Sequence, residues 1–315
     1  MMIMIHLICP NPAIDRTLLI ENFTAETPNR PYKVKEFAGG KSFNVAYALD
    51  FEEGMVPYCI HTILGGRNGN YLKELASTRD IQLETIEVDR NTRCCSIIVD
   101  TTANKIYPIY ENSFVLDALL LNKFTQQLLK AIQPKDTVVF SGSLMKGMPD
   151  DYIAQIQEQL KGQDVRFFID TSGSALVEAF HKNPDVIKIN DEELVDLVPD
   201  HTFTELEDYA DFLKSKTAAA IPYFIITLGA KGVIAKLNQK IYHLSLPPVK
   251  AKNPIACGDF FLGGLVKYLT LEQLDDLDVL KKAISYSTAN VLNWFPEMKQ
   301  IDIDRFEQEI VINNL

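Results

Sequence analysis

From about residue 136 onward, short apolar runs alternate with longer stretches whose apolar residues have helical spacing. The runs at 136–142, 166–170, 185–190 and 222–229 are rich in β-branched residues and show little polar alternation. Such runs are typical of strands that are buried on both faces of a parallel sheet. The pattern predicts an α/β fold in which a doubly wound, mostly parallel sheet carries helices on both faces. Ligands of such sheets bind at the carboxyl ends of the strands.

The first third of the chain has a different pattern, because residues 31–37 and 92–111 alternate between apolar and polar positions around a turn-rich middle. This alternation is typical of antiparallel strands with one exposed face. The segment 43–54 has helical spacing and is expected to end at Gly54. We therefore expect a small β-sheet lid, inserted at about 10–17, 31–37 and 92–111, in a single domain that covers residues 1–315.

Composition narrows the class of protein further. The formal net charge is −11 and 47% of the residues are hydrophobic. This content supports a substantial core, and the acidic charge argues against a nucleic-acid binder, which needs clustered Lys and Arg. The cysteines are odd in number and lack zinc-ligand spacing, which favours a reducing, cytoplasmic setting. The apolar residues 1–10 are too few to span a membrane and are expected to form the first buried strand.

The strongest local signal lies in residues 253–269, where a turn of small residues leads through Asp259 into an apolar-periodic helix. The main-chain N–H groups of Ala256, Cys257 and Gly258 can form an anion-binding concavity, to which the helix dipole adds positive charge. Negative charge that develops on a transferred phosphoryl group would be stabilised there. The alternative is that Asp259 is only the N-cap of the helix.

A second element is the glycine turn in residues 38–49. Gly39 and Gly40 let the backbone approach a ligand closely, and Lys41 and Asn44 supply hydrogen-bond donors. A plain turn before a helix explains the same residues. The GKS triplet is not a P-loop, because that motif requires another glycine five residues before Gly40, where this chain has a lysine.

Two later strand ends also carry candidate ligands. Asn190 ends the run at 185–190 and Glu193 follows one helical turn later, so this pair could hold Mg²⁺ through water. A capping box explains the same spacing. The segment 225–236 runs from a strand into a glycine-bracketed loop, and the residues expected to face a triphosphate are Thr227, Gly229 and Gly232.

Three single residues admit weaker interpretations. Asp15, in NPAID, could accept hydrogen bonds from sugar hydroxyls, although an Asx turn is the default interpretation. Arg93 could clamp a phosphate, although a lone arginine is usually a solvated surface charge. Cys257 lies where a helix N-terminus lowers a thiol pKa, but no histidine stands in a partner motif, so we reject a nucleophilic role. The scattered histidines lack metal spacing and are assigned no role.

These motifs occur in a fixed order that resembles the ribokinase-like PfkB carbohydrate kinases over nearly the whole chain. The motifs are NPAID (11–15), GGK followed by Asn44, GGRNG (65–69), SGSLMKGMP (141–149), NDEE, TLGAKG and ACGD. Within the family, NPAID, GSLMKGMP and DTSG (170–173) are most similar to the branch of 1-phosphofructokinase and tagatose-6-phosphate kinase. The resemblance implies in-line phosphoryl transfer from ATP to a sugar hydroxyl, and a lid that family members often use for dimerisation.

The resemblance also implies roles for the candidate residues. Asp259 corresponds to the catalytic base and residues 256–258 to the anion hole. The residues implied to hold the sugar phosphate are Asp15, Gly39, Gly40, Lys41, Asn44 and Arg93. Asn190 and Glu193 are implied to organise Mg²⁺. The residues implied to lie near ATP are Asn190, Thr227, Gly229, Gly232, Ser287 and Asn290, the last two on a helix expected at 277–295.

The chain departs from the family pattern at two glycines. Ser42 stands where the family usually has Gly after GGK, and Ala256 stands where it usually has GAGD or GSGD. An alanine at a position with positive φ would be strained, whereas in a helical conformation it is nearly free. We expect Ala256 to be helical. Ser42 is expected to narrow the sugar pocket or to donate to the phosphate.

The activity that we predict first is phosphorylation of fructose 1-phosphate to fructose 1,6-bisphosphate. The alternative is phosphorylation of tagatose 6-phosphate. Lys41 and Arg93 favour a phosphate-bearing acceptor over a free sugar or nucleoside. A function of another class is that of a catalytically weakened sensor that binds a sugar phosphate. The loss of two glycines from the family pattern would fit a sensor, whereas the presence of Asp259 argues against it. A dinucleotide oxidoreductase is disfavoured, because no GxGxxG follows the first strand.

Overall fold

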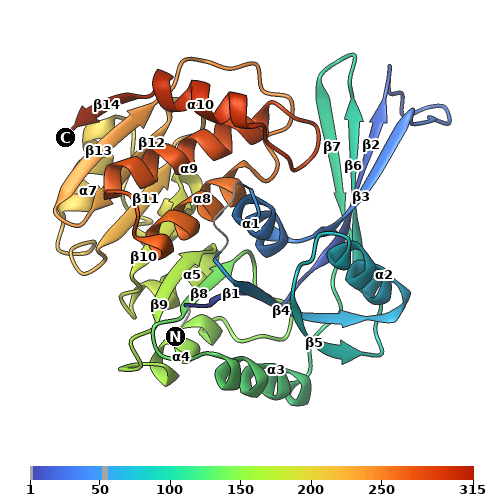
Figure 1. The fold of residues 1–315 in the computed structure, drawn as a ribbon, viewed down its shortest axis with the longest axis horizontal. Helices are drawn as coiled ribbons and strands as arrows, with labels where there is room; N and C mark the ends of the chain where they lie inside the picture. Colours follow the sequence, from blue (N-terminus) through green and yellow to red (C-terminus); the bar gives the residue numbers. More distant parts are fainter. Residues whose placement is uncertain (1–2, 52–55) are drawn as a thin grey trace.

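A computed structural model describes residues 3–51 and 56–315 of the chain, and Figure 1 shows its fold. The larger of its two sheets has ten strands in the order β14-β13-β12-β11-β10-β9-β8-β1-β4-β5. The strands from β5 to β11 in this order pair in parallel, and the pairs from β11 to β14 are antiparallel. The strand bounds are β1 (Ile5–Cys9), β4 (Tyr58–Gly65), β5 (Leu83–Val88), β8 (Thr137–Ser141), β9 (Arg166–Asp170), β10 (Val186–Asn190), β11 (Tyr223–Thr227), β12 (Val233–Leu237), β13 (Lys240–Ser245) and β14 (Val311–Asn314).

Helices cover both faces of this sheet, as the apolar runs predict. One face packs against α1 (Lys41–Leu49), α8 (Cys257–Leu271), α9 (Asp276–Val291) and α10 (Gln300–Glu309). The other packs against α3 (Ala118–Ala131), α4 (Tyr152–Gln159), α5 (Gly173–Phe180), α6 (Asp191–Leu197) and α7 (Leu206–Lys214). In β8, Val139 belongs to the first core, whereas Val138 and Phe140 belong to the second. Consecutive apolar residues are required because alternate side chains enter different cores.

The lid is a separate four-stranded sheet in the order β3-β2-β6-β7. Its strands are β2 (Ala13–Ile20), β3 (Lys33–Gly39), β6 (Arg93–Asp100) and β7 (Lys105–Tyr110). The outer pairs are antiparallel, as expected, but the central pair β2 and β6 is parallel. The purely antiparallel expectation was therefore wrong at this pair, because both strands leave the large sheet in the same direction after β1 and β5 (Figure 1). Helix α2 (Gly66–Ser77) packs on β3.

The predicted element boundaries shift by a few residues. The first lid strand begins at Ala13 and not near residue 10, because Pro10 and Pro12 lie in the turn after β1 and cannot donate to a sheet. The predicted helix at 43–54 begins at Lys41 and its described part ends at Leu49, and the predicted end at Gly54 lies outside the described residues. Within the described ranges, no helix combines the length and apolarity needed to cross a bilayer.

Candidate active site

Two adjoining cavities lie at the carboxyl edge of the large sheet. The first, of about 520 Å³, lies between the lid and the N-termini of α1 and α8. Of the predicted residues, it is lined by Asp15, Gly40, Lys41, Asn44, Arg93, Asn190, Glu193, Thr227, Ala256, Gly258 and Asp259. The second, of about 370 Å³, is lined by Thr227, Gly229, Gly232, Cys257, Gly258 and Ser287. Thr227 and Gly258 border both cavities, so a ligand in one can reach a ligand in the other.

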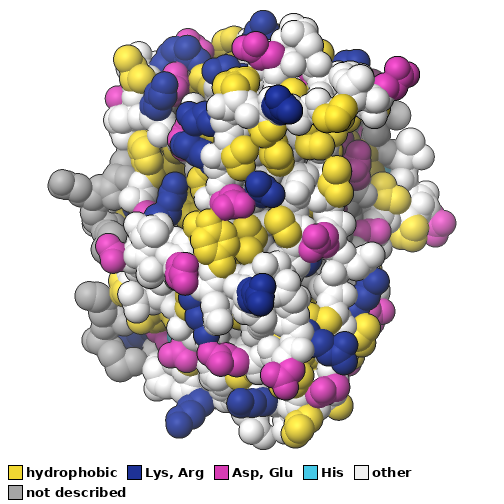
Figure 2. Space-filling model, turned by 90° about the vertical axis from the view of Figure 1, so that its right-hand side faces the viewer, with side chains coloured by type: hydrophobic (Ala, Val, Ile, Leu, Met, Phe, Trp, Pro, Cys, Tyr) yellow, Lys and Arg dark blue, Asp and Glu magenta, His cyan; other side chains and the backbone are white. Residues whose placement is uncertain are grey.

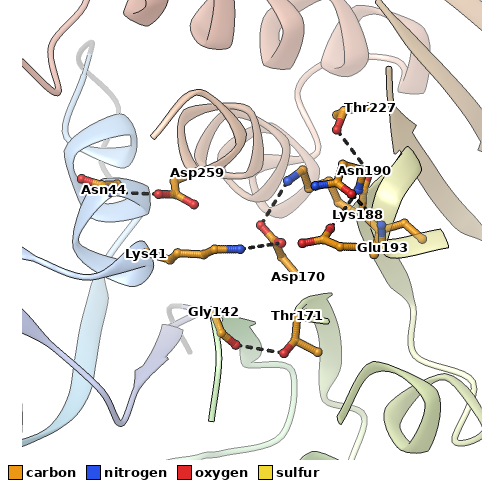
Figure 3. A network of polar contacts seen from close by, with 11 residues as sticks. Lys41, Asn44, Gly142, Asp170, Thr171, Lys188, Asn190, Glu193, Thr227 and Asp259 are labelled. Carbon is orange, nitrogen blue, oxygen red and sulfur yellow. Dashed lines mark hydrogen bonds and ion pairs between the residues drawn. The ribbon is translucent and has the colours of Figure 1, made fainter. Parts of the chain in front are cut away.

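Asp259 lies in the first turn of α8 and is buried. Its Oδ2 accepts a hydrogen bond from Asn44 Nδ2 at 2.8 Å, which joins α8 to α1 (Figure 3). Burial raises the pKa of Asp259 to about 6, and the nearby Lys41 ammonium opposes this rise. A carboxylate with a pKa just below neutrality is suited to accept a proton from a hydroxyl group.

A buried charge cluster lies beside Asp259 at the ends of β9 and β10. The Asp170 carboxylate is fully buried, 3.4 Å from Lys41 Nζ and 3.3 Å from Lys188 Nζ (Figure 3). Burial alone would raise the pKa of Asp170, but the charges of Lys188 and Lys41 outweigh it and hold that pKa below its ordinary value. A Cβ atom at Gly258 would lie 2.9 Å from Lys188 Nζ. The lysine therefore places a cation at the start of α8.

Sequence reasoning missed both Asp170 and Lys188, although each left a signal. Lys188 is the one polar residue inside the apolar run of β10, and its side chain is buried. A lysine at such a position needs a partner or a ligand. Asp170 ends β9 in the way that Asn190 ends β10, so strand-end reasoning could have found it. Tyr110 of the lid also lines the first cavity and was not singled out.

The loop before α8 departs from our expectation at Ala256. This residue has φ 68° and ψ −4°, in the left-handed region, so the helical conformation that we expected is wrong. The cause is a change of chain direction within one residue. The preceding loop is anchored on α9, where Lys252 N donates to Val291 O at 2.8 Å. Immediately afterwards, Asp259 N and Phe260 N both donate to the carbonyl oxygen of Ala256, which begins the helix.

We expect Ala256→Gly to raise the free energy of unfolding by about 1 kcal/mol, because glycine adopts the left-handed region without steric penalty. Glu272 at the other end of α8 has φ 52° and provides a matched control. Glu272→Gly should give a similar rise in a thermal melt and leave turnover unchanged. If Ala256→Gly lowers the melting temperature while Glu272→Gly raises it, the strain at position 256 is refuted.

The same loop contains the three main-chain N–H groups that the sequence singled out. Within the described parts of the chain, the N–H groups of Ala256 and Gly258 have no hydrogen-bond partner, and Cys257 N reaches Pro254 O only at 3.3 Å. Burial raises the pKa of the Cys257 thiol to about 11, which agrees with our rejection of a nucleophilic role. Asn290 is buried beneath the loop and donates to Ile255 O at 3.3 Å, so it supports the loop and does not line the second cavity.

The lid side of the first cavity is built around Asp15. A Cβ atom at Gly39 would overlap the Asp15 carboxyl group, so the missing side chain makes room for it. Burial raises the pKa of Asp15 to about 7, against the charge of Arg93. The Arg93 guanidinium donates to the carbonyl oxygens of Asn11 at 3.2 Å and of Pro12 at 3.4 Å. Arg93 thus ties the lid to the turn after β1 while it lines the cavity.

Gly40 and Ser42 follow Gly39 in the chain, and the structure gives each of them a structural role. Gly40 has φ 114°, which requires glycine, and it directly precedes α1. Ser42 is fully buried, and its hydroxyl donates to Ile8 O at 2.9 Å. Our expectation that Ser42 narrows the pocket or contacts a phosphate was wrong, because its side chain points into the sheet.

The capping-box interpretation of Asn190 and Glu193 is confirmed, and their role toward Mg²⁺ stays a prediction. Glu193 N donates to Asn190 Oδ1 at 2.7 Å and Asn190 N donates to Glu193 Oε2 at 2.9 Å, which is a capping box at the start of α6. Both residues also line the first cavity. No group of three or more His, Cys, Asp or Glu among residues 3–51 and 56–315 is arranged to hold a metal ion.

The second cavity is mostly apolar. Its walls include Leu246, Pro247, Val249, Phe261 and Val291. Apolar surfaces of this kind suit a planar heterocyclic base, with Ser287 as a hydroxyl at the wall. The two adjoining cavities, the cations and the buried carboxylate together have the features of a phosphotransferase of the α/β class.

Comparison with known proteins identifies the family. Residues 6–292 match the model of the pfkB family of carbohydrate kinases, and the chain belongs to this family. It is an ATP-dependent sugar kinase with the predicted ribokinase-like fold. A tagatose-6-phosphate kinase of Staphylococcus epidermidis is 30% identical over 301 residues, which cover 95% of this chain and 94% of that protein.

Solved structures support the fold. Phosphofructokinase-2 from Escherichia coli in complex with substrates and products has a TM-score of 0.88 at 22% identity, covering 97% of this chain and 99% of that one. A protein from Thermotoga maritima described as a possible 1-phosphofructokinase has a TM-score of 0.84 at 20% identity, covering 99% of both chains.

Proposed function

We propose that this kinase phosphorylates a hydroxyl group of a ketohexose monophosphate. The observation that carries the proposal is the first cavity, where buried Asp259 lies beside Lys41 and Lys188 and faces a lid that carries Arg93. One carboxylate suffices to accept the hydroxyl proton, and the remaining task is to position two anionic substrates. A cavity with three cationic side chains is suited to an acceptor that already carries a phosphate.

Tagatose 6-phosphate and fructose 1-phosphate are the two candidate acceptors. The similarity to the staphylococcal tagatose-6-phosphate kinase, which extends over nearly the whole of both chains, favours tagatose 6-phosphate. The motifs NPAID and GSLMKGMP are shared by both branches of the family and keep fructose 1-phosphate, our first prediction from sequence, as the second candidate.

The reacting groups have separate roles in this proposal. Asp259 accepts the proton of the attacking hydroxyl, and Asn44 holds its carboxylate in place. Lys188 and the N–H groups of Ala256 and Gly258 stabilise the charge of the transferred phosphoryl group. Asp170 forms an ion pair with each of Lys41 and Lys188 and so fixes both side chains at the cavity. The ATP base lies in the second cavity between Phe261 and the other apolar side chains of its walls.

The donor set near the triphosphate also fits Mg²⁺. Glu193 has one carboxylate oxygen outside the capping box, and Asn190 lies beside it at the cavity wall. Mg²⁺ usually keeps several waters and takes one or two protein oxygens together with substrate phosphates, so two residues are enough. Bound there, the ion would neutralise charge on the phosphates of ATP.

The function is tested by measuring ADP release from Mg-ATP with tagatose 6-phosphate, fructose 1-phosphate, fructose 6-phosphate, fructose and ribose. We expect turnover with one ketohexose monophosphate and little turnover with the unphosphorylated sugars. Faster turnover with free fructose or ribose would refute a phosphate-bearing acceptor. Tight binding of a sugar phosphate without turnover would favour the sensor function instead.

We further propose that two copies of the chain dimerise through the outer face of the lid. The strand register aligns a row of apolar side chains across this face, namely Val34, Leu18, Ile98 and Tyr107. Figure 2 shows apolar side chains gathered in the middle of this side of the molecule. Ile109 on the same face is 56% exposed. Exposed apolar groups of this kind mark interaction surfaces.

We expect light scattering to show a dimer for the unmodified chain and a monomer for Tyr107→Glu, because a charge buried at an apolar interface is unfavourable. Leu119→Glu is the control, since Leu119 on α3 is 78% exposed and lies outside the lid. A monomer at all concentrations, or a dimer that Tyr107→Glu leaves intact, would contradict the proposed interface.

A further inference from the structure

One side of α8 faces α1, and its residues recur every four positions. Asp259, Gly263 and Lys267 lie one helical turn apart on this stripe. The contact between α1 and α8 is among the most extensive between helices of the fold (Figure 1). At its start, Asn44 of α1 donates to Asp259 at 2.8 Å. The relative position of the two helices therefore determines whether this hydrogen bond forms.

In the middle of the stripe, Gly263 sets how closely the helices approach. A Cβ atom at this position would lie 2.9 Å from the carbonyl oxygen of Val45 and would overlap the Cβ atom of Ala48. Backbone atoms cannot move aside as a flexible side chain can. Any residue larger than glycine must push α1 away from α8.

At the end of the stripe, Lys267 holds the last turn of α1. Its side chain is 1% exposed, and its ammonium group donates to the carbonyl oxygens of Leu49, at 3.2 Å, and of Phe51. These carbonyls lie at the negative end of the α1 dipole, where a cation is favourable. Lys267 thus links the C-terminal end of α1 to α8, two turns from Asp259.

We propose that Gly263 and Lys267 are positioning residues that fix α1 on α8, so that Asn44 holds the Asp259 carboxylate in its reactive position. The proposal rests on the function proposed above, in which Asp259 is the base. Neither residue lines the two cavities, so both act only through the helix contact.

The test compares Gly263→Ala with Gly264→Ala. Gly264 is the next residue of α8 but faces α9, where its Cβ atom would lie 3.1 Å from Ala283 Cα and 3.3 Å from the Tyr286 ring. The two variants share the same chemical change and helix, and they differ in the partner helix that is displaced. We expect Gly263→Ala to lower kcat on the order of 10²-fold with the KM for ATP unchanged. Gly264→Ala should retain kcat, and any effect of its displacement of α9 should fall on the KM for ATP, because Ser287 and Val291 of α9 line the second cavity.

The pH profile provides a readout that a purely structural role would not change. The groups that face Asp259 are Lys41 and Asn44 from α1, Asp170 from β9, Lys188 from β10 and, across the cavity, Asp15 from β2. The Asn44 hydrogen bond lowers the pKa of Asp259, so its loss should move the acid limb of kcat/KM to higher pH in Gly263→Ala but not in Gly264→Ala.

A double-mutant cycle completes the test. If Gly263 acts through Asn44, the double variant Asn44→Ala with Gly263→Ala should lose no more kcat than Asn44→Ala alone. If Gly263→Ala does not fold, Lys267→Met makes the same comparison. Additive losses, or equal kcat for Gly263→Ala and Gly264→Ala, would overturn the inference. Asp259→Asn separates the two proposals, since full activity in that variant would refute the role of Asp259 itself.

Discussion

Replacing Asp259 with asparagine will lower kcat by about 10²–10⁴-fold, because the amide cannot accept the proton of the attacking hydroxyl. The Asn44 contact and the cavity walls remain, so binding of ATP and of the sugar phosphate should change little. The measurement is ADP release under saturating substrates, with binding of each substrate followed by calorimetry. A variant that retains wild-type kcat would exclude Asp259 as the base.

The same variant should be more stable than the unmodified chain at pH 8. Burial raises the pKa of Asp259 from 3.8 to about 6, so the folded state releases this proton at higher pH than the unfolded state. Stability therefore falls as pH rises from about 4 to about 6 and the loss persists above that range. We expect Asp259→Asn to gain on the order of 3 kcal/mol at pH 8, a gain that disappears near pH 4.

Asp170→Asn should change the stability of the fold at pH 8 in the opposite direction, and it serves as the comparison. The charges of Lys188 and Lys41 overcome burial and lower the pKa of Asp170, so its carboxylate stabilises the fold above its unfolded pKa and loses this effect as pH falls. Removal of the carboxylate leaves two cations without their partner, which is strongly destabilising. Denaturant unfolding at pH 8 and pH 4 distinguishes the two variants. If Asp259→Asn is the less stable of the two at pH 8, the electrostatic description is wrong.

The fold could be predicted from sequence because its main signals are local. An apolar run such as 185–190 specifies a buried strand by itself, and the alternation of such runs with helices specifies the parallel sheet. The lid was recognised for the same reason. The parallel pairing of β2 with β6 was missed because it depends on two connections that are far apart in the sequence.

Several residues that line the cavities could be named from sequence, because Asp259 follows a turn of small residues at the start of a helix, and Asn190 and Glu193 follow a buried strand. The shape of the site was not predictable where it depends on the backbone conformation. Ala256 is the example, because its left-handed turn follows from the anchorage of its loop on α9. Lys188 was missed because its partner Asp170 stands 18 residues earlier, so only the folded sheet brings the pair together. The only sign of such a distant ion pair in the sequence is a single charged residue within an apolar run.

Lys188→Met should lower kcat by about 10²–10³-fold, because it removes a cation beside Gly258, at the point where the two cavities meet. Methionine keeps the length and apolar character of the lysine side chain, so the packing of β10 should be preserved. The KM for the sugar phosphate should change less than kcat, since a group that contacts the transferred phosphoryl acts most strongly in the transition state.

Lys236→Met is a matched control for this substitution. Lys236 is also a buried lysine in a strand of the large sheet, and it donates to Ala218 O and Ala219 O. None of these three residues lines either cavity. Burial lowers the pKa of Lys236, so its charge is unfavourable in the fold and its loss should affect stability without affecting kcat. If both variants lose kcat in proportion to their melting temperatures, Lys188 has only a structural role. A loss of kcat in Lys188→Met alone, with partial recovery in Lys188→Arg, would establish that the positive charge acts on the transferred phosphoryl group.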